Sequence, residues 1–277
     1  MAHKVTVLFG AGTGAGIWLQ RWRDASASYL IIDNDSGLWG LERYGVGIAP
    51  PDAIQDVDIE KVIVLFSHVR DARAQLLTLG VPDSAIEVPP KPAFRPQPFL
   101  TAAIRREALD ALRNVLDVLL DASISPIVEQ GAALGLYRDG DLIKWDNDIH
   151  IGVAWKQSSN LSVRSVNALL GSLDGRETSV TVTESGLIAT WLHGDARIPF
   201  TVYSRRVIRR VAAASAGEFL SVPASVWWPP RSYYVNGFKY PLPANPEKYF
   251  EQVYGSDWKT PRPEFSFSDY PQMAEDF

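Results

Sequence analysis

The chain has 277 residues, of which 46% are hydrophobic and 21% charged, and its formal net charge is −5. This length is enough for two domains with separate cores, and the composition is that of an ordinary globular protein. The negative charge balance argues against a nucleic-acid-binding protein, and the absence of cysteine excludes disulfides and thiolate metal sites.

We expect no signal peptide at the beginning of the chain. Residues 1–10 lack the long apolar core and the small-residue cleavage site of a signal peptide. No apolar run approaches the roughly 18 residues that a transmembrane helix needs. We therefore expect a cytoplasmic protein without a transmembrane segment, and any contact with the inner face of a membrane to be peripheral.

Residues 1–88 predict a small α/β domain. Apolar runs alternate with amphipathic segments, which is typical of a parallel sheet with right-handed crossovers. Strands are expected at 4–9, 29–32, 61–66 and 85–88. A first helix is expected to open within 10–16 and to run to about residue 23, and a second helix is expected at 71–79. This part of the chain is interpreted as a Rossmann-like half-domain.

A glycine-rich loop follows the first predicted strand and opens the first predicted helix. Gly10, Gly12 and Ala15 match the dinucleotide-binding fingerprint, and Asp33 ends the second strand, where a carboxylate can bind a ribose hydroxyl. The domain resembles the short Rossmann-like N-terminal domains of many bacterial sugar-modifying enzymes, which implies a nucleotide or nucleotide-sugar ligand. Two alternatives stay open: a loop kept only for close helix–sheet packing, and a domain that performs its own chemistry with a nicotinamide cofactor.

Residues 89–98 contain five prolines and predict a linker between two domains. Proline removes backbone donors and favours extended polyproline geometry, so we expect a semi-rigid linker. The second domain is then expected over residues 99–277. It begins with an amphipathic helix at 101–122, has a further helix at 161–173, and continues in a meander of strands at 179–183, 187–191 and 198–203. These elements predict an α+β domain.

The stretch from Gly131 to Val153 is the most informative part of the sequence. It reads as a short glycine-containing helix, a turn at 139–141 and a strand on which Asp146, Asp148 and His150 alternate with other residues. Side chains on a strand alternate between its faces, so these three ionisable groups are expected on one face. A divalent cation bound to a phosphate would satisfy them, which indicates an active site.

This stretch resembles the LicD family of phosphotransferases, which includes the fukutin-related proteins. Matching positions are Gly131, Gly135, Arg138, Trp145, Asp146 and Asp148. A second block resembling the family spans 234–246 and continues through Tyr249 and residues 254–258, so the resemblance covers roughly residues 99–265. It implies a nucleotidyltransferase-like fold and the transfer of a phosphate-linked group, such as phosphocholine or an alditol phosphate, from a nucleotide diphosphate donor. The acceptor would be a surface glycan or its lipid-linked precursor, which is a step of polysaccharide biosynthesis.

Individual residues are expected to have roles in this chemistry. Asp146, Asp148 and His150 would be the catalytic and metal-binding residues, with Mg²⁺ or Mn²⁺ as the cation. Donor phosphate or other parts of the substrate would contact Gly131, Arg138, Lys144, Asn236 and Lys239. Arg suits phosphate through its planar guanidinium group.

Two positions depart from the family pattern. His150 stands where the family has a third acid, and Thr201 stands where a later strand often supplies another. Imidazole suits transition metals better than magnesium. His150 is interpreted as a metal ligand, a general base, a direct phosphate contact or a satisfied half-buried histidine. A non-catalytic binding or regulatory protein on the same fold is therefore the alternative to a transferase.

Four arginines follow the last predicted strand of the meander, at positions 205, 206, 209 and 210. We expect them to form an exposed basic cluster. Such a cluster either faces solvent or binds an acidic glycan or a lipid diphosphate. The sequence does not indicate an oligomeric state.

Overall fold

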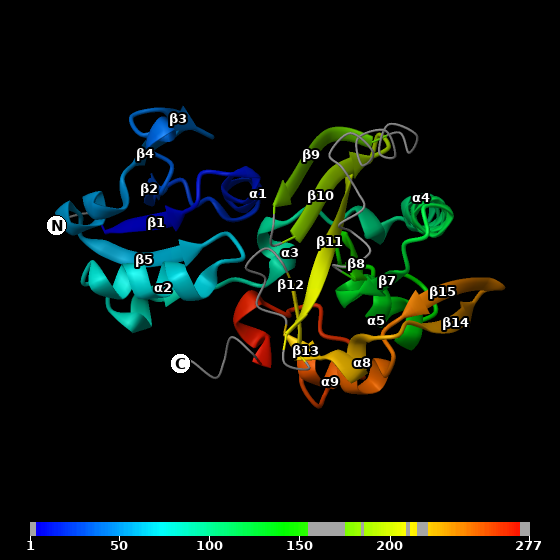
Figure 1. Cartoon of the computed structure of the whole chain (residues 1–277). Helices are drawn as coiled ribbons and strands as arrows, with labels where there is room; N and C mark the ends of the chain where they lie inside the picture. The colour runs from blue at the N-terminus through cyan, green and yellow to red at the C-terminus, as the bar shows by residue number, and fades with distance from the viewer. Residues whose placement is uncertain (1–3, 155–174, 184–185, 209–210, 215–220, 272–277) are drawn as a thin grey trace. The chain divides into compact units, whose positions relative to one another are not determined.

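The computed structural model describes residues 4–154, 175–183, 186–208, 211–214 and 221–271 (Figure 1). The chain forms two compact units. Unit 1 takes the residues up to Pro96 together with the segment from Arg262 onward, and unit 2 takes Gln97–Pro261. The fold class expected from the sequence, a Rossmann-like α/β domain and an α+β nucleotidyltransferase-like domain, is confirmed.

Unit 1 is built around one six-stranded sheet. The strands lie in the order β3-β4-β2-β1-β5-β6, and every neighbouring pair is parallel except β3 with β4. The central strand β1 is buried along most of its length, as expected for a parallel strand packed on both faces. The elements are β1 (Val5–Phe9), α1 (Thr13–Trp22), β2 (Ser28–Ile32), β3 (Glu42–Arg43), β4 (Val46–Ala49), β5 (Ile59–Val64), α2 (Val69–Thr78) and β6 (Ile86–Glu87).

The proline-rich segment differs from the extended linker that we expected. It contains a helical turn, α3 (Lys91–Phe94), whose Phe94 is fully buried in unit 1. A Cβ at Gly14 would lie 3.2 Å from the Phe94 ring, so α1 and α3 approach closely because residue 14 has no side chain. The segment is thus partly folded into unit 1, because burial of Phe94 outweighs the preference of its prolines for extended geometry.

The end of the chain also differs from the expected domain of 99–277. The backbone N–H of Lys91 donates to the Phe265 carbonyl at 3.3 Å, and the Lys91 ammonium donates to the Tyr270 hydroxyl at 2.7 Å. The ammonium also lies 4.8 Å from the centre of the Phe267 ring, within the range of a cation–π contact. These contacts explain why the segment from Arg262 packs with unit 1.

Unit 2 contains a mixed sheet and a separate hairpin. The order β13-β12-β11-β10-β9 is antiparallel, while β8 lies parallel to β11 and carries β7 on its other edge. The expected meander is confirmed as β9 (Gly175–Thr183), β10 (Gly186–His193) and β11 (Ile198–Ile208). The expected helix at 161–173 lies outside the described residues. The other strands are β7 (Pro126–Glu129), β8 (Ile149–Ala154), β12 (Val211–Ala214), β13 (Val222–Pro223) and the hairpin β14 (Arg231–Val235) and β15 (Phe238–Leu242).

The longest helix of unit 2 is α4 (Ala102–Asp121), as its apolar periodicity predicts. It buries Leu109, Leu112, Val115 and Leu119, while polar residues of the opposite side stay exposed. Shorter helices are α5 (Gln130–Arg138), α8 (Ala224–Trp227) and α9 (Pro246–Tyr254). Among the described residues, no helix is both long enough and apolar enough to cross a membrane.

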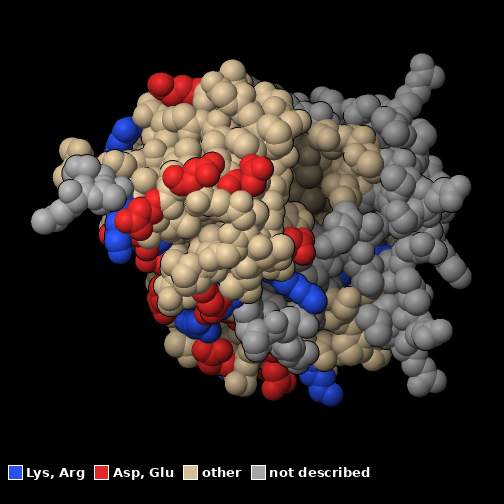
Figure 2. Space-filling model, turned by 90° about the vertical axis from the view of Figure 1, so that its left-hand side faces the viewer, with Lys and Arg blue, Asp and Glu red and all other residues tan. Residues whose placement is uncertain are grey.

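Charges of both signs lie on the face of the molecule that Figure 2 shows. On the face drawn in Figure 2, Asp and Glu side chains lie among uncharged residues and beside Lys and Arg. This mixed distribution agrees with the small negative net charge of the chain.

Candidate functional site

The candidate site lies where β7 enters α5 and where the chain returns through a loop into β8. β8 begins only at Ile149, so Asp146 and Asp148 lie in the loop before the strand. We expected both aspartates within the strand. Asp and Asn have low strand propensity, which explains why regular pairing begins after them.

Asp146 is held against the first turn of α5. A Cβ at Gly131 would lie 1.7 Å from Oδ2 of Asp146, so any side chain at this position would require the carboxylate to move. The other carboxylate oxygen, Oδ1, accepts a hydrogen bond from the Asn147 backbone N–H at 3.0 Å. Glycine at position 131 therefore creates the space that this carboxylate occupies.

Asp148 and His150 lie on the same side of the chain, as their spacing of two residues predicts. Oδ1 of Asp148 is 3.6 Å from Nδ1 of His150, and the two side chains are 34% and 15% exposed. His150 pairs with Thr201 in the parallel register of β8 and β11, which puts Thr201 on the same face. The position where we expected a further acid is therefore occupied by a threonine directly beside His150.

The fit of these residues to a divalent cation depends on what completes its ligand shell. Among the described residues, no group of three or more His, Cys, Asp or Glu side chains is arranged to hold a metal ion. The residues therefore do not form an all-protein cage from Asp146, Asp148 and His150. Magnesium usually binds through one or two carboxylates together with substrate phosphates and water, and that pattern fits Asp146 and Asp148.

The first residue of α5 has an unusual backbone. Gln130 has a φ of +52°, in the left-handed region that non-glycine residues rarely adopt. Its backbone N–H donates to the Tyr249 hydroxyl at 3.3 Å, and its side-chain amide donates to the Tyr203 hydroxyl at 3.4 Å. Strained residues of this kind persist when their surroundings hold them, and they cluster at functional sites.

Those two tyrosines belong to a buried network that sequence reasoning missed. At its centre is Glu129, the last residue of β7, whose side chain is fully buried. The Glu129 carboxylate accepts from Arg205 Nε at 2.9 Å, the Tyr203 hydroxyl at 2.7 Å, the Trp227 indole at 2.6 Å and the Tyr249 hydroxyl at 3.0 Å. A buried carboxylate requires this degree of compensation.

Arg205 corrects our expectation of an exposed basic cluster. Its side chain is fully buried and bound to Glu129, so it is unavailable to a glycan or a lipid. Arg209, Arg210 and the side chain of Arg206 lie outside the described residues. The sequence signal that could have revealed this role is the alternation of Tyr203 and Arg205 along β11, which puts both on the face that carries Glu129.

The network shifts the pKa values of its members in opposite directions. Burial alone would raise the pKa of Glu129, but the Arg205 guanidinium and the hydrogen-bond donors outweigh it, so this pKa lies below its ordinary value. Burial, opposed by the Glu129 charge, leaves the pKa of Arg205 well above its ordinary value. Burial and the Glu129 carboxylate together raise the pKa of Tyr249 well above its ordinary value. The network therefore contains a stable ion pair and a neutral Tyr249 at neutral pH.

A second glycine provides space for this buried carboxylate. A Cβ at Gly152 in β8 would lie 1.9 Å from Oε1 of Glu129. The two glycines thus have the same structural role, since Gly131 leaves room for the Asp146 carboxylate and Gly152 for the Glu129 carboxylate.

Arg138 and Lys144 lie at the two ends of the segment that joins α5 to Asp146. Arg138 ends α5, so it lies about 10 Å along the helix axis from Gly131. Its guanidinium donates to both carboxylate oxygens of Asp139 at 2.8 Å and to the Trp258 carbonyl at 3.1 Å. Asp139 and the Trp258 carbonyl thus hold the Arg138 guanidinium in place, and its contact with donor phosphate stays a prediction. Lys144 is exposed in the turn before Asp146.

Asn236 and Lys239 lie on the β14–β15 hairpin. The Asn236 side-chain amide donates to the Gly140 carbonyl at 3.0 Å and so ties the hairpin to the turn after α5. Lys239 is exposed and lines a hollow beside α4. Asn236 therefore supports the loop that leads to Asp146.

In unit 1 the predicted fingerprint residues come together around the start of α1. Gly10 has a φ of +109°, which favours glycine, and Oδ2 of Asp33 accepts from the Ala11 backbone N–H at 2.7 Å. The Tyr44 ring covers Gly16, where a Cβ would lie 2.5 Å from it. Asp33 is therefore joined directly to the glycine-rich loop, and the loop lies between the end of β1 and the start of α1, as the fingerprint predicts.

These features define the class of unit 2, a nucleotidyltransferase-like domain with two loop-borne acids beside a helix start. Residues 123–245 match the family model described as LicD/FKTN/FKRP, nucleotidyltransferase domain. This match confirms, for residues 123–245, the resemblance to the LicD family that the sequence predicted. Members of this family are transferases.

Comparison with solved structures finds only distant similarity. UDP-D-quinovosamine 4-dehydrogenase from Vibrio fischeri is 17% identical, with 31% of this chain and 75% of that chain covered and a TM-score of 0.25. The antibiotic-resistance factor ANT(2'')-Ia is 14% identical, with 62% and 85% covered and a TM-score of 0.35. No curated protein matches the chain in sequence. At these TM-scores neither structure carries an argument about function.

Proposed function

We propose that unit 2 transfers a phosphate-linked group from a nucleotide diphosphate donor to a hydroxyl of a surface glycan or its lipid-linked precursor. The observation that carries this proposal is the Asp146 carboxylate seated against Gly131 at the start of α5, with Asp148 two residues further on. Family membership supports a transferase. The transferred group, phosphocholine-like or alditol-phosphate-like, is part of the proposal.

The start of α5 is a suitable place for a donor phosphate. No side chain caps this helix, and the positive end of a helix dipole attracts anions. Two carboxylates beside it would repel a phosphate by themselves. A divalent cation held by Asp146 and Asp148 would neutralise that repulsion and stabilise charge on the diphosphate.

The remaining chemistry is assigned to residues of the same face. The acceptor hydroxyl oxygen forms a bond to phosphorus, while the bond from that phosphorus to the nucleoside monophosphate oxygen breaks. His150, beside Asp148, is placed to receive the hydroxyl proton, since an imidazole can act as a base near neutral pH. Glu129 and its partners hold Gln130 and are positioning residues.

A non-catalytic ligand-binding protein on the same fold is the second candidate. It is favoured by one observation, the pairing of His150 with Thr201 at positions where acids were expected. Such a protein would bind its ligand without regard to divalent cations.

Unit 1 is proposed to bind a nucleotide or a nucleotide-sugar. The supporting observation is the link between Asp33 and the Gly10–Gly12 loop, which sets a carboxylate beside the turn where a diphosphate would lie.

A thermal-shift screen with CDP, CTP, UDP, GDP and NAD, each with and without Mg²⁺ or Mn²⁺, tests these proposals. A transferase in unit 2 is expected to be stabilised by one nucleotide only when the cation is present, and Asp148→Asn is expected to remove that effect. Stabilisation that ignores both the cation and this substitution but disappears in Asp33→Ala would assign the ligand to unit 1. In that case the non-catalytic reading of unit 2 would replace the transferase.

A further inference from the structure

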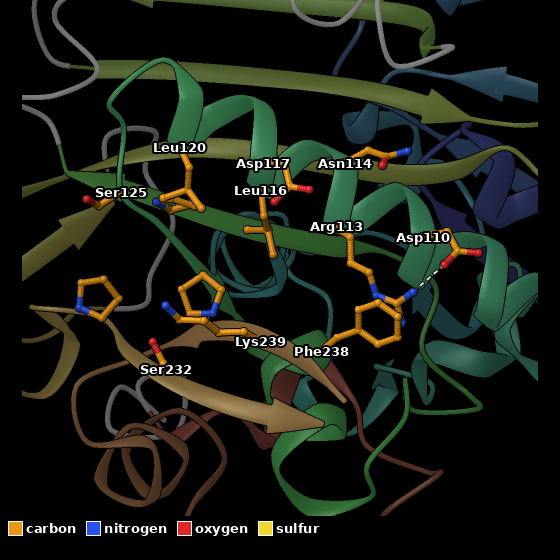
Figure 3. A pocket seen from close by; sticks show the side chains of 13 residues that line it. Asp110, Arg113, Asn114, Leu116, Asp117, Leu120, Ser125, Ser232, Phe238 and Lys239 are labelled. Atoms are coloured by element: carbon orange, nitrogen blue, oxygen red, sulfur yellow. Dashed lines mark hydrogen bonds and ion pairs between the residues drawn. The ribbon is translucent and has the colours of Figure 1, made fainter. Parts of the chain in front are cut away.

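The exposed side of α4 borders two adjoining hollows in unit 2. The larger, of about 730 Å³, lies between α4 and the β14–β15 hairpin (Figure 3). The smaller, of about 470 Å³, lies toward the start of α4 and reaches His193 at the end of β10. Asp110 and Asn114 line both hollows, so the two adjoin along the helix, and we call them together the groove.

This groove is long and open. It follows α4 from Ala103 to Leu120, a rise of about 26 Å. Its length suits an extended ligand made of several linked rings and exceeds what a single nucleotide needs. An extended shape is the first property of the ligand that the structure indicates.

The polar lining of the larger hollow consists of groups that bind hydroxyls. Asn114 and Asp117 project from α4, Ser125 follows the end of that helix, and Ser232 lies on the hairpin (Figure 3). Amide, carboxylate and hydroxyl groups together donate and accept hydrogen bonds, which matches a ligand that carries many hydroxyls.

Apolar surface lies among these polar groups. Leu120 is 53% exposed and Phe238 46% exposed, and both line the larger hollow. The Arg113 guanidinium stacks at 3.5 Å from the centre of the Phe238 ring and is also bound to Asp110 at 2.6 Å. The ring is thus held in place, and a fixed aromatic or aliphatic surface suits the C–H face of a sugar ring.

The charges of the groove balance. Three acids, Glu107, Asp110 and Asp117, line it together with three bases, Arg106, Arg113 and Lys239. A groove for a polyanion would need an excess of bases. A balanced lining therefore favours an uncharged ligand.

We propose that this groove binds an uncharged oligosaccharide. As a binding site the groove stands independently, and its use for the acceptor of the transfer rests on the proposed function. The occupant is identified by three observations: the length of the groove, its hydroxyl-binding groups among apolar surfaces, and its balanced charge.

An array of neutral, sialylated and sulfated oligosaccharides, probed with the labelled full-length chain, tests the proposal. Binding to neutral oligosaccharides of several rings is expected. The double variant Asn114→Ala/Asp117→Ala is expected to weaken it by about tenfold or more, because two hydrogen-bonding side chains are lost. Asp121→Ala, an exposed acid of α4 outside both hollows, is the matched control and is expected to bind as the parent does.

These experiments distinguish a wrong proposal about the groove from a wrong proposal about the function of unit 2. Absence of binding to neutral oligosaccharides, binding only to sialylated or sulfated ones, or equal binding by the double variant and the control would each overturn the groove proposal. Asp148→Asn is expected to leave array binding unchanged while it removes cation-dependent nucleotide binding. Loss of the nucleotide effect alone would therefore leave the groove intact.

Discussion

Replacing Gly131 with alanine tests whether the position of the Asp146 carboxylate matters for function. The new Cβ would lie 1.7 Å from Oδ2 of Asp146, whereas real Cβ contacts are essentially never shorter than 3.0 Å. The carboxylate must therefore retreat by about 1.3 Å or rotate away. Asp146 belongs to a partly exposed loop, so it can move without disturbing the core.

The expected effect on stability is small and can be positive. Gly131 is not among the residues with positive φ, and alanine is favoured over glycine in a helix by about 0.5–1 kcal/mol. Moving one carboxylate away from the start of α5 removes a favourable dipole interaction of about 0.3–1 kcal/mol. The two effects are of similar size and opposite sign, so the free energy of unfolding is expected to change by less than about 1 kcal/mol.

The expected effect on nucleotide binding is much larger than the effect on stability. A displacement of this size takes the Asp146 carboxylate out of contact with a bound cation. The affinity for the nucleotide in the presence of the cation should therefore fall by about 100-fold. Calorimetric titration of the parent and the variant measures this change, and chemical denaturation measures the free energy of unfolding. In an Asp146→Ala background the same glycine substitution should only stabilise the helix. Unchanged nucleotide affinity in Gly131→Ala with an intact fold would refute the role assigned to Asp146.

Three further predictions concern the support of the site and unit 1. Gly152→Ala is expected to destabilise unit 2 by about 3 kcal/mol or more. Its Cβ would lie 1.9 Å from the buried Glu129 carboxylate, which is bound on all sides and cannot retreat. A melting temperature equal to that of the parent would contradict this prediction. Glu129→Gln is expected to cost about 3–5 kcal/mol in urea denaturation, because it leaves Arg205 buried without its counter-charge. The pKa of Glu129 in the folded protein lies below the reference value of 4.5, so the ionised carboxylate stabilises the fold above pH 4.5. This stabilisation is lost as the pH falls toward the folded pKa. Acid unfolding of the parent should therefore be steeper than that of the variant. Asp33→Ala removes the acceptor for the Ala11 N–H, and it should weaken nucleotide binding to unit 1 about tenfold in a fluorescence titration while the metal-dependent effect in unit 2 persists.

Much of the fold could be predicted from local patterns. The apolar runs of unit 1 and the helical periodicity of α4 are strong signals because each depends on neighbouring residues only. The Gly10–Gly12 loop was placed correctly between strand and helix for the same reason. Phe94 shows the limit, since nothing in a proline-rich segment indicates that one phenylalanine will fold it back into unit 1.

The site could be predicted only in part because its support comes from distant segments. Asp146, Asp148 and Gly131 were found as a short motif, and their proximity is a local consequence of the turn between α5 and β8. Glu129 is satisfied by residues 74 to 120 positions away in the sequence, and only the tertiary fold brings them together. A glutamate before a glycine-rich helix start is read more naturally as exposed, so it gave no signal of burial.

The contrast between the two glycines suggests how the site is organised. Gly152 makes room for a carboxylate that is locked by an arginine and three neutral donors, which is an arrangement built for rigidity. Gly131 makes room for a carboxylate on a partly exposed loop, which can adjust its position when a charged ligand arrives. Functional residues often lie on loops that a rigid scaffold positions, and here the scaffold holds Gln130 directly beside the adjustable acid. The two departures from the family pattern, His150 and Thr201, lie on the regular strands β8 and β11, so the absence of both expected acids leaves the two carboxylates of the loop in place for the proposed cation and donor.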